Sequence, residues 1–167
     1  GSKTGIRFSN DLSYNEEFNP YTFRNFFNGG GVAIGDVNND GLVDLYFSGN
    51  QNSGRLYINK GNFKFEDVTE KAGLITNRWC TGVSMVDINQ DGWLDIYVNV
   101  AGSPKFGNTA NLLYINNGFS PSPNKLKNPI SFSERAGPLT ADKAEARGAV
   151  PFPADAANSA IAATRSA

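Results

Sequence analysis

An internal repeat is the feature of this sequence that most restricts its fold. Residues 31–46 read GVAIGDVNNDGLVDLY and residues 82–97 read GVSMVDINQDGWLDIY, so that Asp36 and Asp87 lie 51 positions apart. The similarity continues downstream, where LYINKG at 56–61 matches LYINNG at 113–118, and FKFEDVTEKAGL at 63–74 matches the more divergent ISFSERAGPL at 130–139. A repeat of about 50 residues is typical of a propeller blade or a comparable β array.

Within each repeat the pattern is that of short strands separated by turns. Val43, Leu45 and Phe47 alternate with polar or aromatic residues, and Gly, Asn and Ser cluster between such runs. This period of two is that of a strand, and those clusters are typical of turns. The pattern predicts strands at 32–37, 43–48, 55–59 and 63–68, and again at 82–88, 94–99, 112–116 and 130–133.

These strands predict an all-β fold built of tandem four-stranded antiparallel blades. Propellers close with about four to eight blades, so two units form only a partial β-propeller. The expected segments are a lead-in at 1–30 that could hold the outer strand of a preceding blade, blade-like repeat 1 at 31–81, blade-like repeat 2 at 82–137, and an Ala-rich tail at 138–167 that is poorly ordered or forms short helices.

A nine-residue loop with the pattern Asp-x-Asn-x-Asp-Gly-x-x-Asp occurs once in each repeat, at 36–44 (loop 1) and at 87–95 (loop 2). Calcium takes about six to eight oxygen ligands, which a curled loop with alternate side chains turned inward can supply. The glycine permits a sharp turn with positive φ, and position 7 would offer a backbone carbonyl. The predicted ligands of two Ca²⁺ sites are Asp36, Asn38, Asp40, Leu42 and Asp44, and Asp87, Asn89, Asp91, Trp93 and Asp95.

Three other interpretations of these loops are an EF-hand, a magnesium site and a pair of Asx-turns without metal. An EF-hand requires Glu at position 12 and flanking helices, but that position is Phe47 in one copy and Val98 in the other. Magnesium is disfavoured, because several protein oxygens in a flexible loop suit the larger ion. The Asp and Asn side chains could instead form Asx-turns that cap their own backbone. Recurrence in register with the repeat favours calcium, since clustered carboxylates repel one another unless a cation joins them.

The composition removes most enzyme chemistry. The 167 residues include no His and one Cys, which excludes His-based acid–base catalysis, Ser-His and Cys-His nucleophile pairs, and an intramolecular disulfide. A net charge of −1 from 15 basic and 16 acidic residues carries no electrostatic footprint for nucleic acid. The apolar runs are too short for a membrane span. We identify no catalytic or cofactor-binding residue and expect no enzyme activity.

Three other groups of residues have simpler structural interpretations. Glu66, Asp67 and Glu70 resemble a glycosidase carboxylate pair only superficially, and a solvated strand-to-turn segment accounts for them. Cys80 has no His beside it in sequence to activate it, and is expected to be a buried apolar residue. Tyrosines that recur in register are expected to pack in the core, with a sugar-stacking surface as the alternative; they are Tyr46, Tyr57, Tyr97 and Tyr114.

The segment FNGGGVAIGDVNNDGLVDLYFSGN resembles the FG-GAP repeats of integrin α-chain propellers and the related bacterial VCBS repeats. A closer resemblance, to ASPIC/UnbV-type proteins, is carried by GIRFSN, LYINKGNFKFEDVTEKAGL and RWCTGVSMVDINQDGWLDIYV; cartilage acidic protein is similar to these proteins. The resemblance implies a β-propeller with structural calcium, in secreted or surface-attached proteins. It also implies that the ligand positions of the family fall on the loop residues named above. Ser48-Gly49-Asn50 replaces the GAP element of those repeats.

From the loops and the resemblance we expect a calcium-binding repeat module that binds a protein or a glycan outside the cytoplasm or on the cell surface. The alternative is a non-catalytic accessory part of a larger secreted hydrolase. Because two blades cannot close a ring, self-association as an incomplete propeller is a further expectation.

Overall fold

The computed structural model describes residues 3–101, 109–118 and 130–135, all of which belong to one compact unit, Gly1–Gly137. Its elements are β1 (Val32–Gly35), β2 (Asp44–Phe47), β3 (Arg55–Asn59), β4 (Phe65–Asp67), β5 (Cys80–Val86), β6 (Asp95–Val100), β7 (Leu112–Asn116) and β8 (Phe132–Arg135). Antiparallel pairing joins them in the orders β1-β2-β3-β4 and β5-β6-β7-β8. The predicted all-β fold with two four-stranded antiparallel sheets is thus confirmed. The Ala-rich tail lies outside the described residues.

Strand ends differ from the prediction where a side chain takes a backbone hydrogen bond. The strand expected at 32–37 ends at Gly35, because the N–H of Val37 donates to the Asp44 carboxylate at 3.0 Å. The strand expected at 82–88 begins earlier, at Cys80, and a bulge between Cys80 and Val83 shifts its register against β6. Bulges of this kind increase the local twist of a strand.

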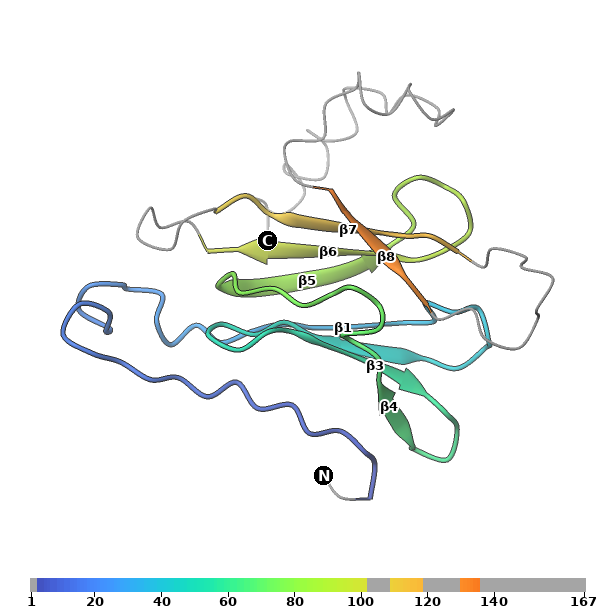
Figure 1. The fold of residues 1–167 in the computed structure, drawn as a ribbon, viewed down its shortest axis with the longest axis horizontal. Coiled ribbons are helices and arrows are strands. Elements are labelled where there is room, and N and C mark those ends of the chain that lie inside the picture. Colours follow the sequence, from blue (N-terminus) through green and yellow to red (C-terminus); the bar gives the residue numbers. More distant parts are fainter. Residues whose placement is uncertain (1–2, 102–108, 119–129, 136–167) are drawn as a thin grey trace, which may run out of the picture. The chain divides into compact units, whose positions relative to one another are not determined.

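The main hydrophobic core lies between the two sheets, which form the two layers seen in Figure 1. Tyr46 comes from the first sheet, while Ile96 and Val98 come from the second. The other buried members are Val37, Leu56, Ile58, Ala72, Leu74, Cys80, Leu112, Tyr114 and Phe132. Tyr46, Tyr57 and Tyr114 are buried, as expected of packing residues, whereas Tyr97 is half-buried and its hydroxyl accepts a hydrogen bond from the Asn111 side chain at 2.7 Å.

The two sheets meet through opposite faces of the repeat. Successive residues of a strand point to opposite faces, and on β2 the buried side chains are Asp44 and Tyr46, while Leu45 is only half-buried. On β6 the residue equivalent to Leu45 is Ile96, which is fully buried in the core. One face of repeat 1 therefore covers the other face of repeat 2, which is how adjacent blades of a propeller-like array pack.

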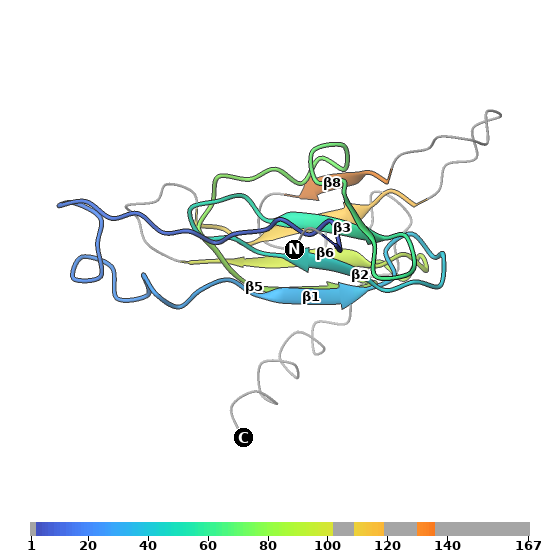
Figure 2. The same ribbon diagram turned by 90° about the horizontal axis from the view of Figure 1, so that it is seen from below.

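The lead-in lies along the outer face of the first sheet, where Figures 1 and 2 both show it. Phe8 stacks on Phe47 with ring centroids 5.2 Å apart, and the N–H of Arg7 donates to the Tyr57 hydroxyl at 3.1 Å. Residues 3–30 contain no strand, in contrast to the outer strand that the sequence allowed there. Further along, Phe23 and Phe26 of the lead-in form a second core cluster with Trp79 and Ala101.

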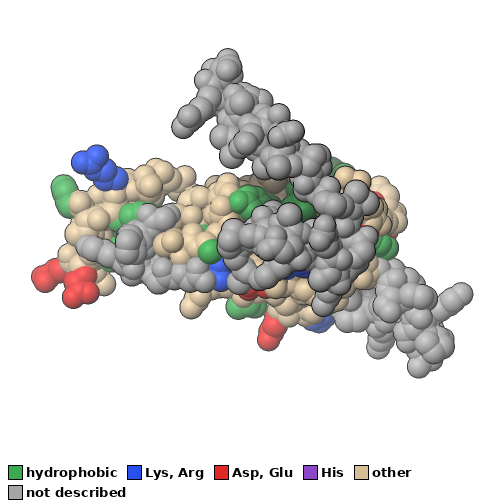
Figure 3. All heavy atoms as spheres, turned by 90° about the horizontal axis from the view of Figure 1, so that it is seen from above, with side chains coloured by type: hydrophobic (Ala, Val, Ile, Leu, Met, Phe, Trp, Pro, Cys, Tyr) green, Lys and Arg blue, Asp and Glu red, His purple; other side chains and the backbone are tan. Residues whose placement is uncertain are grey.

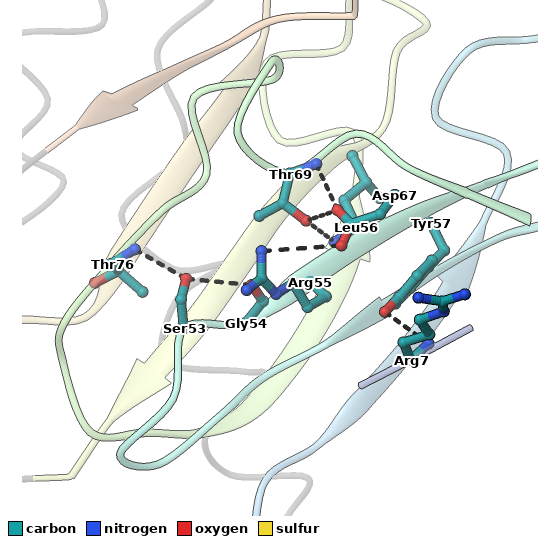
Figure 4. A network of polar contacts seen from close by, with 9 residues as sticks. All are labelled: Arg7, Ser53, Gly54, Arg55, Leu56, Tyr57, Asp67, Thr69 and Thr76. Atoms are coloured by element: carbon teal, nitrogen blue, oxygen red, sulfur yellow. Dashed lines mark hydrogen bonds and ion pairs between the residues drawn. The ribbon is translucent and has the colours of Figure 1, made fainter. Parts of the chain in front are cut away.

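Side-chain hydrogen bonds hold the edge strand β4 and the connection to repeat 2 (Figure 4). Both the N–H and the hydroxyl of Thr69 donate to Asp67 Oδ1, at 3.0 and 2.6 Å, and the N–H of Leu56 donates to the Thr69 hydroxyl at 2.9 Å. The N–H of Thr76 donates to the Ser53 hydroxyl at 3.1 Å. These contacts stabilise an edge that has few ladder bonds of its own.

The described surface is mixed in charge. On the face shown in Figure 3, the described acidic and basic side chains are scattered and do not gather into one patch of a single sign. No helix within the described ranges is long and apolar enough to cross a membrane.

Candidate metal centre

Loop 1 connects β1 to β2 and is organised by its own acidic side chains. Asp36 accepts hydrogen bonds from the backbone N–H groups of Asp40 (3.1 Å) and Gly41 (2.7 Å). Asn38 Oδ1 also accepts from the Asp40 N–H at 3.1 Å, and Asp40 Oδ1 accepts from the Leu42 N–H at 2.9 Å. The side chains at positions 1, 3 and 5 thus all turn toward the inside of one tight turn.

Loop 2, between β5 and β6, repeats this geometry. Asp87 accepts from the N–H groups of Asp91 (3.1 Å) and Gly92 (2.8 Å). Asn89 accepts from the Asp91 N–H at 3.2 Å, and Asp91 accepts from the Trp93 N–H at 2.9 Å. Matching positions agree to 0.1 Å, so the spacing of Asp, Asn and Gly is sufficient to set the loop's conformation.

Left-handed backbone conformations close both turns. Gly41 and Gly92 have φ of 83° and 85°, and the residues two positions before them, Asn39 and Gln90, have φ of 55° and 60°. A glycine adopts such angles without the steric cost that a Cβ atom brings. Asn is also among the residues enriched at positive φ. The glycine predicted to permit the sharp turn does so in both copies.

The ninth residue of each loop is a buried carboxylate at the start of a strand. Asp44 is fully buried, and its two oxygens accept hydrogen bonds from Asn59 N–H (2.8 Å) and Val37 N–H (3.0 Å). Burial raises the pKa of the Asp44 carboxyl above its ordinary value; those two hydrogen bonds oppose the shift, and the charges of Asp40 and Asp36 add to it. The negative charges of Asp36 and Asp40 therefore oppose the ionisation of the buried Asp44 carboxyl.

Asp95 in loop 2 has the same surroundings. It is fully buried and accepts from Asn116 N–H at 2.8 Å and Ile88 N–H at 3.1 Å. Its pKa is raised by burial, lowered by these two hydrogen bonds, and raised again by Asp91 and Asp87. Within the described residues, no Lys or Arg forms an ion pair with a carboxylate of either loop.

The side chains as placed form Asx-turns, so that interpretation describes the loops as they stand. No three Asp, Glu, His or Cys side chains in the described ranges are grouped closely enough to hold a metal ion in this arrangement. The donor set nevertheless fits calcium. An ionised carboxylate offers about four lone-pair sites, whereas each oxygen of Asp36 and Asp44 accepts one amide hydrogen in the described structure.

The structure brings the predicted side-chain ligands of each loop into one turn, but it treats the two position-7 residues differently. Leu42 is exposed, whereas the Trp93 side chain is half-buried and packs against Gly118. The two residues are so close that a Cβ atom on Gly118 would lie 2.9 Å from Nε1 of Trp93. Only their N–H groups are engaged in the loop bonds described above.

Asn59 and Asn116 belong to the site although the sequence interpretation did not include them. Their backbone N–H groups bind the buried carboxylates, and their side chains bond Val43 and Leu94 carbonyls at 3.0 and 3.1 Å. The signal that could have revealed them is the in-register match of LYIN at 56–59 with LYIN at 113–116.

The other residues considered from sequence have structural roles. Glu66 is exposed and pairs with Lys60 (3.3 Å) and Lys71 (3.5 Å), and the hydrogen bond from Lys60 is the largest factor that lowers its pKa. Asp67 holds Thr69. Cys80 is buried in the main core, and this burial raises its thiol pKa to about 11. None of these contacts resembles a pair of catalytic carboxylates or an activated thiol.

The fold and the duplicated loop define a propeller-like repeat protein. A family model described as an FG-GAP-like repeat matches residues 36–98, a span that runs from the first residue of loop 1 through loop 2 into β6. Over these residues the chain is similar to an FG-GAP-like repeat, in agreement with the resemblance seen in the sequence. No curated protein matches the chain.

Proposed function

We propose that this chain is a calcium-binding β-propeller repeat module in which loops 1 and 2 each hold one structural Ca²⁺. The observation that carries the proposal is the duplicated loop, in which the charges of two carboxylates repel that of a buried third, Asp44 or Asp95. Bound calcium would supply the positive charge that offsets this repulsion. The residues that would hold it are Asp36, Asn38, Asp40, Leu42 and Asp44, and Asp87, Asn89, Asp91, Trp93 and Asp95.

The module's proposed role is to bind a protein or a glycan outside the cytoplasm. Weak calcium sites are typical of extracellular modules, which meet high calcium concentrations. The lead-in supports a binding role, because it presents large exposed aromatic side chains, Tyr14, Tyr21 and Phe27. Aromatic residues are enriched at interfaces. The closer similarity to ASPIC/UnbV-type proteins is part of this proposal.

Thermal unfolding with and without calcium tests the metal sites. A ligand that binds only the native state stabilises it by RT ln(1 + [L]/Kd), so a concentration of ten times Kd adds about 1.4 kcal/mol per site. The melting temperature should therefore rise from EGTA to millimolar CaCl₂, and less in MgCl₂. An identical melting temperature in EGTA and calcium would refute the proposal.

Calorimetric titration assigns the ions to the loops. The full chain should bind two Ca²⁺, and Asp40→Ala or Asp91→Ala should each reduce the stoichiometry to one, because each removes the central carboxylate of a single loop. The double variant serves as the matched control and should bind none. A stoichiometry that stays at two in either single variant would show that the ligand set is wrong.

A further inference from the structure

The two loops are joined directly to each other. The side-chain amide of Asn39, at position 4 of loop 1, donates to the carbonyl of Gly92 in loop 2 at 3.0 Å. Both loops lie at the same end of the sheets, on the right in Figure 1. Within the described residues no hydrogen bond joins the side chain of Gln90, the equivalent residue of loop 2, to loop 1, so this connection comes from one loop only.

A second, buried residue bonds both loops at once. Asn116 is 3% exposed, and its side-chain amide donates to the Val37 carbonyl of loop 1 at 2.8 Å and to the Leu94 carbonyl of loop 2 at 3.1 Å. Its backbone N–H also donates to Asp95 at 2.8 Å. Asn116 thus connects the backbone of loop 1, through its side-chain amide, to the buried carboxylate of loop 2, through its backbone N–H.

The equivalent residue in repeat 1 shows what the neighbouring blade adds. Asn59 makes the same local contacts, with its N–H on Asp44 at 2.8 Å and its side-chain amide on the Val43 carbonyl at 3.0 Å. Its contacts to a calcium loop are confined to loop 1 in the described structure. The additional bond from Asn116 to Val37 exists only where two repeats pack side by side.

We propose that loops 1 and 2 bind calcium with positive cooperativity, because Asn39 and Asn116 hold the two loops in a common arrangement. This inference rests on the proposed calcium sites. An ion that orders one loop also restrains the atoms that the other loop must order, so the second ion meets a smaller entropic cost. By linkage, the effect of loop 1 on loop 2 must equal the effect of loop 2 on loop 1.

A site-resolved titration of the full ¹⁵N-labelled chain with CaCl₂ tests this inference. The amide signals of Gly41 and Gly92 report the loops separately, because each N–H is bonded to the first Asp of its own loop. We expect Asp40→Ala to abolish the response of Gly41 and to weaken calcium binding at loop 2 about fivefold or more, as typical coupling energies give. Asp91→Ala should weaken loop 1 by the same factor.

Asn39→Gly tests the connecting bond, because glycine keeps the positive φ of 55° at this position while removing the side chain. In this background, Asp40→Ala should weaken loop 2 by less than half of the factor seen with Asn39 present. Gln90→Gly is the matched control and should leave the coupling unchanged. The amide signal of Ile88, whose N–H is bonded to Asp95 within loop 2, should be the same in EGTA in all these variants, which excludes a distortion of loop 2 as the cause.

The possible results separate the two proposals. If neither glycine signal responds to calcium, the calcium function itself is wrong. If both respond but Asp40→Ala leaves the affinity of loop 2 unchanged or higher, the sites exist and the cooperativity is overturned. If the coupling is present but equally strong in Asn39→Gly, the role given to Asn39 is overturned.

Discussion

Repeats 1 and 2 share a sequence pattern but differ in what covers them. Val32, Ile34 and Val43 of repeat 1 are 56%, 67% and 51% exposed. The equivalent residues of repeat 2 are Val83, Met85 and Leu94, which are partly buried and packed against the core between the sheets. The same apolar face is thus covered by the other sheet in repeat 2, whereas in repeat 1 the lead-in contacts it at Phe47 and leaves these three residues exposed. A blade of this kind is built to receive a neighbour on this face, and only repeat 2 has one there in the described structure.

The loops of the two repeats show the opposite behaviour. Their internal hydrogen bonds match position by position, although loop 1 and loop 2 have different neighbours. Contacts made within nine residues are therefore insensitive to the packing of the sheets. Each repeat therefore sets the geometry of its own loop, whereas the adjacent repeat determines which of its faces is buried.

The largest effect should come from truncating the covered face. Ile96→Ala is expected to destabilise the chain by about 2–5 kcal/mol, because it leaves a cavity in a core where Ile96 is fully buried. Ile34→Ala makes the same chemical change on the open face, and should shift stability by no more than about 0.5 kcal/mol. Urea unfolding of both variants measures the difference. Similar costs at the two positions would show that the open face is covered in solution.

Cys80 reports whether the two sheets separate. It is buried at their interface and its pKa is raised to about 11, so few thiolates are present at pH 8. From its pKa alone, labelling with a thiol reagent should be at least about a hundredfold slower than for the unfolded chain, whose thiol pKa is about 8.5. Rates in native buffer and in denaturant give this ratio. Fast labelling in native buffer would mean that the sheets part readily.

Removing either buried carboxylate should destabilise the chain less than Ile96→Ala does, and the two losses should be equal. In EGTA, Asp44→Ala and Asp95→Ala each leave two backbone N–H groups without their acceptor, at about 1–3 kcal/mol for each group. The substitution also removes a carboxylate that is costly to bury and that its neighbours repel, so the net loss should be about 1–3 kcal/mol. The two losses should agree within about 0.5 kcal/mol if the loops are independent of their surroundings. Urea unfolding in EGTA measures both. A much larger loss for Asp95 would show that the bonds of Asn116 depend on that carboxylate.

The smallest effect on folding should come from substitutions on the exposed face of repeat 1. These should change the self-association of the chain and leave its stability nearly unchanged. The exposed Val32, Ile34 and Val43 favour self-association and dye binding of the isolated chain. Ile34→Lys should shift sedimentation toward the monomer with little change in stability. Ile75→Lys is the control, because Ile75 is also exposed but lies outside the strands. A wild-type chain that stays monomeric at all concentrations would contradict this prediction.

Much of the fold could be predicted because its signals are local. The alternation around Leu45 and Ile96 predicts strands, and the spacing from Asp36 to Asp44 predicts a turn in which the side chains converge. The faces were harder to predict. On β2 the residues that enter the core are Asp44 and Tyr46, because Asp44 is satisfied by two backbone N–H groups and the neighbouring sheet covers Tyr46. A hydrophobicity pattern carries no information about which of two apolar faces meets a neighbour.

The sequence by itself determined the repeat, the eight strands and the inner geometry of both loops. The strands follow from a local alternation of side chains, and the inner geometry of the loops depends on hydrogen bonds that span two to seven residues. Only the tertiary structure decided which face is buried, where the lead-in lies and how the loops are joined. The Asn39–Gly92 and Asn116–Val37 bonds span 53 and 79 residues. Such contacts form only once two sheets have packed, and their partners cannot be identified from local spacing.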